Sequence, residues 1–219
     1  MRIYEQIIKS GSLCFDVGAN IGVMTQRMLD CGAKIVIAIE PQHLLAKQLK
    51  EKFKSDQVHV LAYAISDKEG KAILKCCSSN QLATLSDKFM CCTSQWRFPD
   101  EKWTETEKVE TRTLNSLIQT YGDPDFIKID VEGYEPEVLS TLVKPVKYLC
   151  WEHTPEIIDN TTLILDRFKT TCPNFHYNFE IGDDQQFHFN TWVSGEELME
   201  YLTPIRDFQV FFGNIYAKA

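Results

Sequence analysis

The sequence lacks any apolar segment long enough to cross a membrane. A membrane-spanning helix needs about 18 or more consecutive apolar residues, whereas apolar runs here, such as residues 35–39, are far shorter. A signal peptide pattern is also missing, because Glu5 and Lys9 interrupt the stretch where its apolar core would stand. These absences predict a protein without a membrane span and with a cytoplasmic location, or else one domain cut from a longer multidomain chain.

Clusters of positive charge are absent as well. The 219 residues include 23 lysines and arginines against 31 aspartates and glutamates, which gives a net charge of −8. An acidic surface repels phosphate backbones, so we expect no nucleic-acid partner. A neutral or cationic small molecule is easier for such a surface to accommodate.

None of the eight cysteines forms a C-x-x-C pair, the spacing that is typical of zinc sites. Their even number would allow disulfides, but the missing signal peptide argues against an oxidising compartment. We favour reduced thiols, with Cys14 and Cys150 as small core residues inside strand-like segments.

Internal repeats and low-complexity tracts do not occur either. Hydrophobic residues make up 44% of the chain and charged residues 25%, which is the globular average and excludes wholesale disorder. The length fits one ordinary domain with a full core. We therefore expect a single domain over residues 1–219.

Strand-like and helix-like segments alternate along the chain. This alternation predicts an α/β fold in which a parallel sheet has helices on both faces. The last strand is expected to run antiparallel to a neighbour at about residues 175–180. The expected strands are 12–16, 34–39, 58–65, 125–130, 146–151 and 208–217, and the expected helices follow Gly22 and Pro41 and cover 114–121, 135–143, 161–170 and 196–202.

One segment interrupts this alternation. Residues 71–75 read as an added hairpin strand, and residues 76–106 read as an irregular insertion that forms a lid on the substrate side. Its aromatic residues either stack on the apolar face of an acceptor or simply pack the insertion onto the domain. They are Trp96, Phe98 and Trp103.

The turn after the first strand carries the clearest ligand signal. Residues 16–22 read DVGANIG, and glycines there let a ligand approach the backbone closely. The dinucleotide fingerprint G-x-G-x-x-G is not present, and neither is the Gly-Lys-Ser/Thr ending of a phosphate-binding loop. The loop therefore suits a nucleoside ligand without a pyrophosphate. Glu40 ends the second strand about 20 residues later, where a carboxylate can bind both ribose hydroxyls; taken alone, it could also be a solvated acid at a helix start.

Acidic residues stand at four predicted strand ends. They are Asp16, Glu40, Asp130 and Glu152. In an open parallel sheet the ligand crevice lies outside the carboxyl ends of the strands, so these carboxylates would repel one another there. A cationic ligand relieves that repulsion. Lys128 lies on the same strand face as Asp130, and we expect it to be a structural partner for one of the crevice carboxylates.

Four stretches of the sequence resemble the FkbM-type methyltransferases. They are residues 15–22 (FDVGANIG), 39–41 (IEP), 64–67 (AISD) and 125–135 (DFIKIDVEGYE). The resemblance implies a class I methyltransferase: a Rossmann-like fold with a seven-stranded, mostly parallel sheet, and S-adenosyl-L-methionine (SAM) as cofactor. The cofactor-binding residues that it implies are Asp16, Gly18, Ala19, Asn20, Gly22, Glu40, Ala64 and Ile65.

The resemblance also implies transfer of a methyl group to a hydroxyl oxygen, which requires removal of a proton. We expect His153 to be the general base, oriented by Glu152, with Asp130 and Glu132 as further catalytic carboxylates. A histidine capped at a strand end is the structural alternative. We predict no resident metal, although Asp130, Glu152 and His153 offer the donor types that a divalent ion would use.

The function expected on these grounds is SAM-dependent O-methylation of a sugar or glycan hydroxyl. The acceptor could instead be a lipid, a macrolide or another natural product. A third alternative is a non-catalytic SAM-fold module that serves as a partner within a larger assembly.

Overall fold

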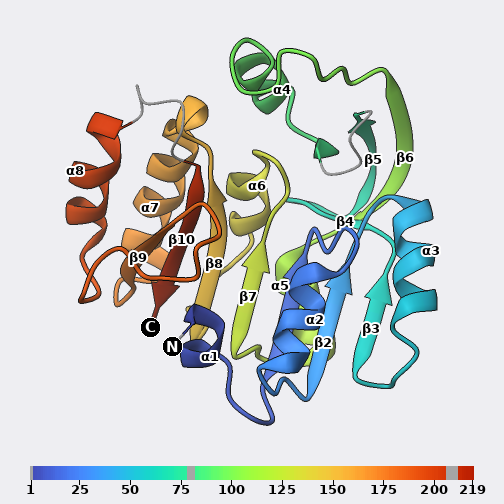
Figure 1. The fold of residues 1–219 in the computed structure, drawn as a ribbon, viewed down its shortest axis with the longest axis horizontal. Coiled ribbons are helices and arrows are strands. Elements are labelled where there is room, and N and C mark those ends of the chain that lie inside the picture. The colour runs from blue at the N-terminus through green and yellow to red at the C-terminus, as the bar shows by residue number, and fades with distance from the viewer. Residues whose placement is uncertain (1, 78–81, 206–211) are drawn as a thin grey trace.

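The computed structural model describes residues 2–77, 82–205 and 212–219. Its core is a seven-stranded sheet with the order β3-β2-β1-β7-β8-β10-β9 (Figure 1). Neighbouring strands from β3 to β8 pair in parallel, and β10 is antiparallel to both of its neighbours. The strands are β1 (Leu13–Val17), β2 (Ile35–Ile39), β3 (Val58–Leu61), β7 (Phe126–Ile129), β8 (Tyr148–His153), β9 (His176–Ile181) and β10 (Gly213–Lys218).

Helices cover both faces of this sheet, which confirms the predicted α/β fold. Alternate residues of each strand point to opposite faces of the sheet. Because helices cover both faces, nearly every residue of the central strands is apolar. One face packs against α5, α6, α7 and α8 around Trp151, and the other packs against α1 and α2 around Phe126. The helices are α1 (Ile3–Ile7), α2 (Val23–Asp30), α3 (His43–Lys52), α5 (Leu114–Tyr121), α6 (Glu135–Leu139), α7 (Asp159–Thr171) and α8 (Gly195–Ile205), with a 3₁₀ turn η2 (Pro155–Ile157).

Several helix ends follow from local sequence. Thr113 caps α5 by accepting the Ser116 N–H, and Gly122 ends it with a φ of 96°. Ser194 and Glu197 form the predicted capping box at the start of α8. Cys14 and Cys150 are fully buried in the sheet, as predicted. Among the described residues, no helix is both long and apolar enough to span a bilayer.

The insertion is more regular than predicted. It begins and ends in a second, three-stranded sheet of order β4-β6-β5, made of β4 (Ala64–Ile65), β5 (Gly70–Cys76) and β6 (Glu105–Arg112). The hairpin strand expected at 71–75 is therefore confirmed as part of β5. Helix α4 (Asp87–Thr93) begins at Ser86, whose hydroxyl accepts the Phe89 N–H. Most described residues between β5 and β6 are irregular as expected, but the helix α4 within them was not predicted.

Two other expected elements differ from the structure. The strand predicted over 58–65 is divided, because β3 ends at Leu61 and Ala64–Ile65 pairs with β6 in the small sheet. The final strand begins at Gly213 and pairs antiparallel with β9 as expected. The first part of the predicted range, residues 208–211, lies outside the described residues.

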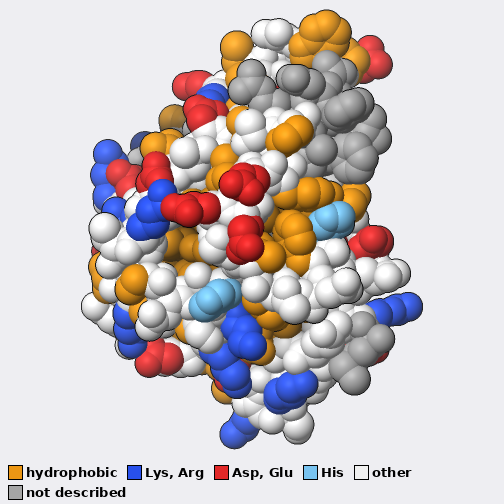
Figure 2. Space-filling model, turned by 90° about the vertical axis from the view of Figure 1, so that its left-hand side faces the viewer, with side chains coloured by type: hydrophobic (Ala, Val, Ile, Leu, Met, Phe, Trp, Pro, Cys, Tyr) orange, Lys and Arg blue, Asp and Glu red, His pale blue; other side chains and the backbone are white. Residues whose placement is uncertain are grey.

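The edge of the large sheet carries a surface groove of its own. A hollow of about 1050 Å³ lies between α7, α8 and β9. Apolar side chains are visible on this side of the molecule among scattered charged ones (Figure 2). The groove shares no lining residue with the hollows at the strand ends.

Candidate functional site

The glycine loop after β1 packs closely against the end of the neighbouring strand β7. Gly18 has a φ of 86°, and a Cβ there would lie only 1.8 Å from the Asp130 carbonyl oxygen at the end of β7. Gly22 has a φ of 78°, and a Cβ there would meet the Phe53 and Leu49 side chains at 2.5 and 2.7 Å. Both positions therefore require glycine. The loop leaves an opening between the ends of β1, β2 and β7.

Asp16 holds this loop from inside the protein. Its carboxylate is buried and accepts a 2.5 Å hydrogen bond from the Thr25 hydroxyl in α2. Burial raises the pKa of Asp16 to about 6. The contact fixes the start of α2 relative to β1, and a direct role of Asp16 in binding the cofactor stays a prediction.

A first hollow of about 530 Å³ opens beside the loop. The structure brings together there most of the residues expected to bind the cofactor, and adds residues of the small sheet and the insertion that the sequence did not single out. The expected residues are Gly18, Asn20, Glu40, Ala64 and Ile65, and the added ones include Tyr63, Leu74, Ala83, Thr84 and Leu85. Ala19 lines an adjoining hollow, and Gly22 begins α2.

Glu40 presents a buried carboxylate to the first hollow. One carboxylate oxygen accepts the Asn20 N–H and the other accepts the Gln42 N–H, each at 2.8 Å. Burial raises the pKa of Glu40 to about 7, although the two N–H groups oppose this shift. The Gln42 side chain makes a further hydrogen bond to this carboxylate. A carboxylate offers about four acceptor sites, so Glu40 can still accept a hydrogen bond from a ligand.

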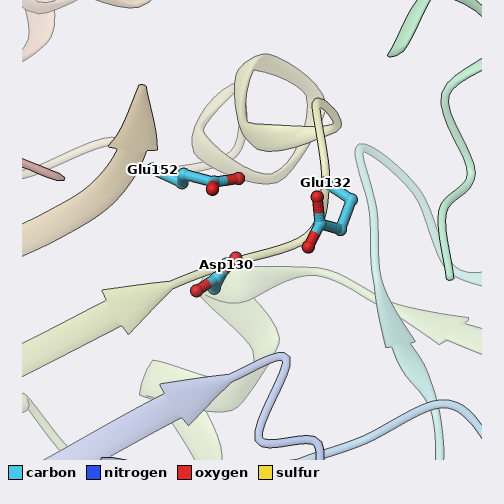
Figure 3. Close-up of side chains that lie close together, drawn as sticks. All are labelled: Asp130, Glu132 and Glu152. Atoms are coloured by element: carbon cyan, nitrogen blue, oxygen red, sulfur yellow. The ribbon is translucent and has the colours of Figure 1, made fainter. Parts of the chain in front are cut away.

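Three carboxylates meet at the strand ends in the adjoining hollow. Oxygen atoms of Asp130, Glu132 and Glu152 all lie within 4.8 Å of one another, and the side chains point toward a common space (Figure 3). This second hollow is about 690 Å³ and shares Gly18, Asn20, Asp130 and Glu132 with the first. We call these three residues the carboxylate cluster.

Repulsion within the carboxylate cluster is strong. Burial, followed by the neighbouring Glu152 and Asp130 carboxylates, raises the pKa of Glu132 well above its usual range. Burial and the Asp130 and Glu135 carboxylates do the same for Glu152. One oxygen of Glu152 has no hydrogen-bond partner among the described residues. The cluster therefore has acceptor capacity and protonatable groups directed at the hollow.

Lys128 forms an ion pair with a carboxylate of the crevice, as predicted. It is 2% exposed, and its Nζ contacts Asp130 Oδ2 at 3.2 Å and Asn214 Oδ1 at 2.8 Å. Burial lowers the pKa of Lys128, but Asp130 and other neighbouring groups outweigh this effect and raise it well above the usual value. The lysine therefore stays charged and partly balances the cluster.

Lys128 is supported by residues that the sequence did not single out. Asn214 Nδ2 donates to Glu180 Oε2 at 3.1 Å, and the Tyr216 hydroxyl donates to the same oxygen at 2.7 Å. Glu180 is fully buried. The available signal was the position of Glu180 and Asn214 next to apolar residues of expected strands, since buried polar groups need hydrogen-bond partners.

His153 does not reach the carboxylate cluster. It is 1% exposed, its Nδ1 lies 2.9 Å from the Thr161 hydroxyl of α7, and its ring meets Phe179 edge-on. Burial lowers its pKa to about 4. Adjacent residues of a strand face opposite sides of the sheet, so Glu152 faces the hollow while His153 faces α7. The structure thus brings Asp130, Glu132 and Glu152 together without the histidine. For the same reason His153 cannot share a divalent ion with Asp130 and Glu152, as the sequence would have allowed.

The insertion lies above the carboxyl ends of the parallel strands (Figure 1). Arg97 forms a bidentate ion pair with Glu156 of η2, with both contacts at 2.9 Å. Trp103 Nε1 donates to the Leu82 carbonyl at 2.7 Å, and its ring packs edge-on against Phe89. Trp103 therefore packs the insertion itself, whereas Trp96 is 64% exposed. The part of the insertion that reaches the site lines the first hollow, through residues 83–85.

Comparison with known proteins agrees with this architecture. The family model described as "Methyltransferase FkbM domain" matches residues 16–208. A crystal structure of an FkbM methyltransferase from Methylobacillus flagellatus KT aligns with a TM-score of 0.56 and 16% identity, covering 99% of this chain and 48% of that one. A precorrin-6y C5,15-methyltransferase from Geobacter metallireducens GS-15 aligns with a TM-score of 0.52 and 9% identity, covering 99% of this chain and 85% of that one.

These likenesses identify the fold as that of class I methyltransferases. The chain spans about half the length of the Methylobacillus structure. No curated protein shows significant sequence similarity to it.

Proposed function

Since the chain belongs to the FkbM family of SAM-dependent methyltransferases, we propose that it transfers a methyl group from SAM to a hydroxyl oxygen of a sugar or glycan. The observation that carries the proposal is the junction of two hollows. The first offers Glu40 and apolar walls to a nucleoside, and the second gathers three carboxylates beside the same glycine loop. The two hollows share Asp130 and Glu132, so a cofactor and an acceptor would meet there.

The residues of the first hollow fit SAM chemically. Glu40 would accept hydrogen bonds from the ribose hydroxyls, and the side chains of Tyr63, Leu74 and Leu85 would contact the base. When bound, SAM supplies an electrophilic methyl group on a sulfonium. The positive charge of the sulfonium and of the amino group matches the negative charge of the carboxylate cluster, which Lys128 only partly balances.

The carboxylate cluster supplies the base in this proposal. A sugar hydroxyl is a poor nucleophile while it keeps its proton, and a general base works best when its pKa lies near the operating pH. Burial and mutual repulsion raise the pKa of Glu132 and Glu152 well above the usual range of a carboxyl group, which makes each carboxylate a stronger proton acceptor. Glu132 and Glu152 both line the second hollow, where the hydroxyl would bind, so either carboxylate could accept that proton. The remaining contribution of the site is to hold the hydroxyl in line with the methyl group and to exclude water.

An acceptor with an apolar body is the second candidate, and one observation favours it. Ile21 and Val23 line the second hollow and are 51% and 48% exposed. Such side chains suit a lipid, a macrolide or a similar natural product as well as the apolar face of a sugar ring.

A labelled-methyl transfer screen tests the proposal. The protein is incubated with SAM carrying a labelled methyl group and with three panels of acceptors: simple methyl glycosides, oligosaccharides, and apolar polyols. We expect transfer to the first two panels, with a Glu40→Ala variant needing a higher SAM concentration to reach the same rate. Transfer confined to the apolar polyols would favour the second candidate. SAM binding measured by calorimetry without transfer to any panel would contradict both and favour a non-catalytic module.

A further inference from the structure

The turn that carries Glu132 has an unusual backbone. Glu132 has a φ of 55° and Gly133 a φ of 84°, so two successive residues occupy the left-handed region. A side chain other than glycine avoids this region at a cost on the order of 1 kcal/mol. The conformation directs the Glu132 carboxylate toward Asp130 and Glu152 (Figure 3). Such a turn persists only where neighbouring groups hold it.

Three separate elements hold this turn. Glu135 Oε1, at the start of α6, accepts the N–H groups of Val131 and Gly133 at 3.1 and 3.2 Å. Asn160 Nδ2, in α7, donates to the Gly133 carbonyl at 3.0 Å. The third contact comes from the insertion, because the Thr84 hydroxyl donates to the Glu132 carbonyl at 2.7 Å. Of the three, the Thr84 bond is the one made to Glu132 itself.

The Thr84 hydroxyl has a fixed direction. Thr84 is 1% exposed, and its backbone exchanges two 2.9 Å hydrogen bonds with Lys75 of β5. Its oxygen accepts the Ser86 N–H at 2.8 Å, so the hydroxyl proton is directed to the Glu132 carbonyl. Phe89, also in the insertion, packs closely against Gly133 of the same turn. A Cβ added at Gly133 would lie only 2.6 Å from the Phe89 side chain.

Thr84 also lines the first hollow, beside the residues expected to contact the nucleoside. We propose that Thr84 is a positioning residue, which acts through the Glu132 backbone to hold the Glu132 carboxylate in the carboxylate cluster. This inference rests on the proposed function for its catalytic consequence, but its structural part can be measured without any acceptor. It gives the insertion a role in the chemistry as well as in covering the nucleoside.

The test compares three variants. Thr84→Val removes the hydroxyl at nearly constant volume, and Thr84→Ser keeps it. Thr93→Val is the matched control, because Thr93 is also buried in the insertion and donates a 2.7 Å hydrogen bond, but to the Phe89 carbonyl within α4. Each protein is saturated with S-adenosylhomocysteine (SAH), and hydrogen–deuterium exchange is followed by mass spectrometry in the peptide covering residues 130–135.

We expect Thr84→Val to raise the exchange rate of this peptide on the order of tenfold, while Thr84→Ser and Thr93→Val leave it within twofold of the original. With an acceptor found by the methyl-transfer screen, Thr84→Val should lower kcat roughly 10–100-fold. Its SAM affinity should change much less, and Thr84→Ser should restore kcat.

Unchanged exchange in Thr84→Val would overturn the inference. Equal exchange increases in Thr84→Val and Thr93→Val would do the same, since they would show general loosening of the insertion. An exchange effect specific to Thr84→Val, in a protein that transfers no methyl group to any panel, would support the positioning contact while contradicting the proposed function.

Discussion

Glu40 holds a buried carboxylate at the end of β2, where its two oxygens accept the N–H groups of Asn20 and Gln42. We expect Glu40→Ala to weaken SAM binding by about 1.5–3 kcal/mol, because the ribose hydroxyls lose a charged hydrogen-bond partner. Calorimetric titration with SAM and SAH measures the change. Glu69→Ala, which removes an exposed acid, is the control and should bind normally. Unchanged affinity in Glu40→Ala would exclude the ribose role.

His153 leads to a different expectation. Its burial against Thr161 and Phe179 indicates a structural side chain. We predict that His153→Ala lowers the free energy of unfolding by about 2–4 kcal/mol, because it leaves a cavity and an unpaired Thr161 hydroxyl. At a temperature where the variant is folded, kcat should stay near that of the original protein. A large loss of kcat in a stable variant would restore the histidine as a catalytic residue.

At the scale of elements, the start of α6 is bound to the turn before it by Glu135. Burial raises the pKa of Glu135 from 4.5 to about 7, so the folded protein holds this proton more tightly than the unfolded chain does. The contribution of the Glu135 proton to the free energy of unfolding is therefore fully present below about pH 4.5, and it is lost as the pH rises through about 7. Glu135→Gln removes this titration while its Oε1 can still accept both backbone N–H groups.

We expect Glu135→Gln to gain stability relative to the original protein with rising pH, by up to about 3 kcal/mol. Denaturant unfolding of both proteins at about pH 5.5 and about pH 8.5 gives the comparison. Asp16 and Glu40 also have raised pKa values, but they are present in both proteins. A difference that is the same at both pH values would contradict the assignment.

The insertion gives a second expectation at this scale. Trp103 is packed between Leu82 and Phe89, so Trp103→Ala should lower the free energy of unfolding by about 2–4 kcal/mol. Trp96 is 64% exposed, and Trp96→Ala should change stability by less than about 0.5 kcal/mol. Of these two tryptophans, Trp96 is the one that can still raise the acceptor KM when removed. Equal destabilisation by both substitutions, measured by urea unfolding, would contradict this division.

Local patterns explain which elements the sequence could predict. The strands of the large sheet carry apolar runs, and Thr113 and Ser194 cap their helices, so their positions follow from neighbouring residues. Strand β6 is polar at most positions and finds its partners at a distance in sequence, so no local pattern indicates it. His153 was misplaced because β8 continues to His153, two residues beyond the predicted end at residue 151. The alternation of side chains along the strand then turns the His153 ring away from the side that Glu152 faces.

At the scale of the whole molecule, the site lies where separate parts of the chain meet. Asp130, Glu132 and Glu152 follow from strand ends, and the sequence predicted that they would be near one another. Thr84, Asn160 and Asn214 were not predicted, because each contacts residues more than 25 positions away in the sequence. Only packing of the complete fold determines such contacts.

The covering of the first hollow by the insertion has a kinetic consequence. Leu74 and residues 83–85 form part of the wall around the nucleoside, while Ile21 and Val23 leave the second hollow open to solvent. We therefore expect an ordered sequential mechanism, in which SAM binds first and SAH leaves last. Product-inhibition patterns test this: SAH should compete with SAM but not with the acceptor. The methylated product separates the two mechanisms. With random addition it would compete with the acceptor, whereas in the ordered mechanism it does not.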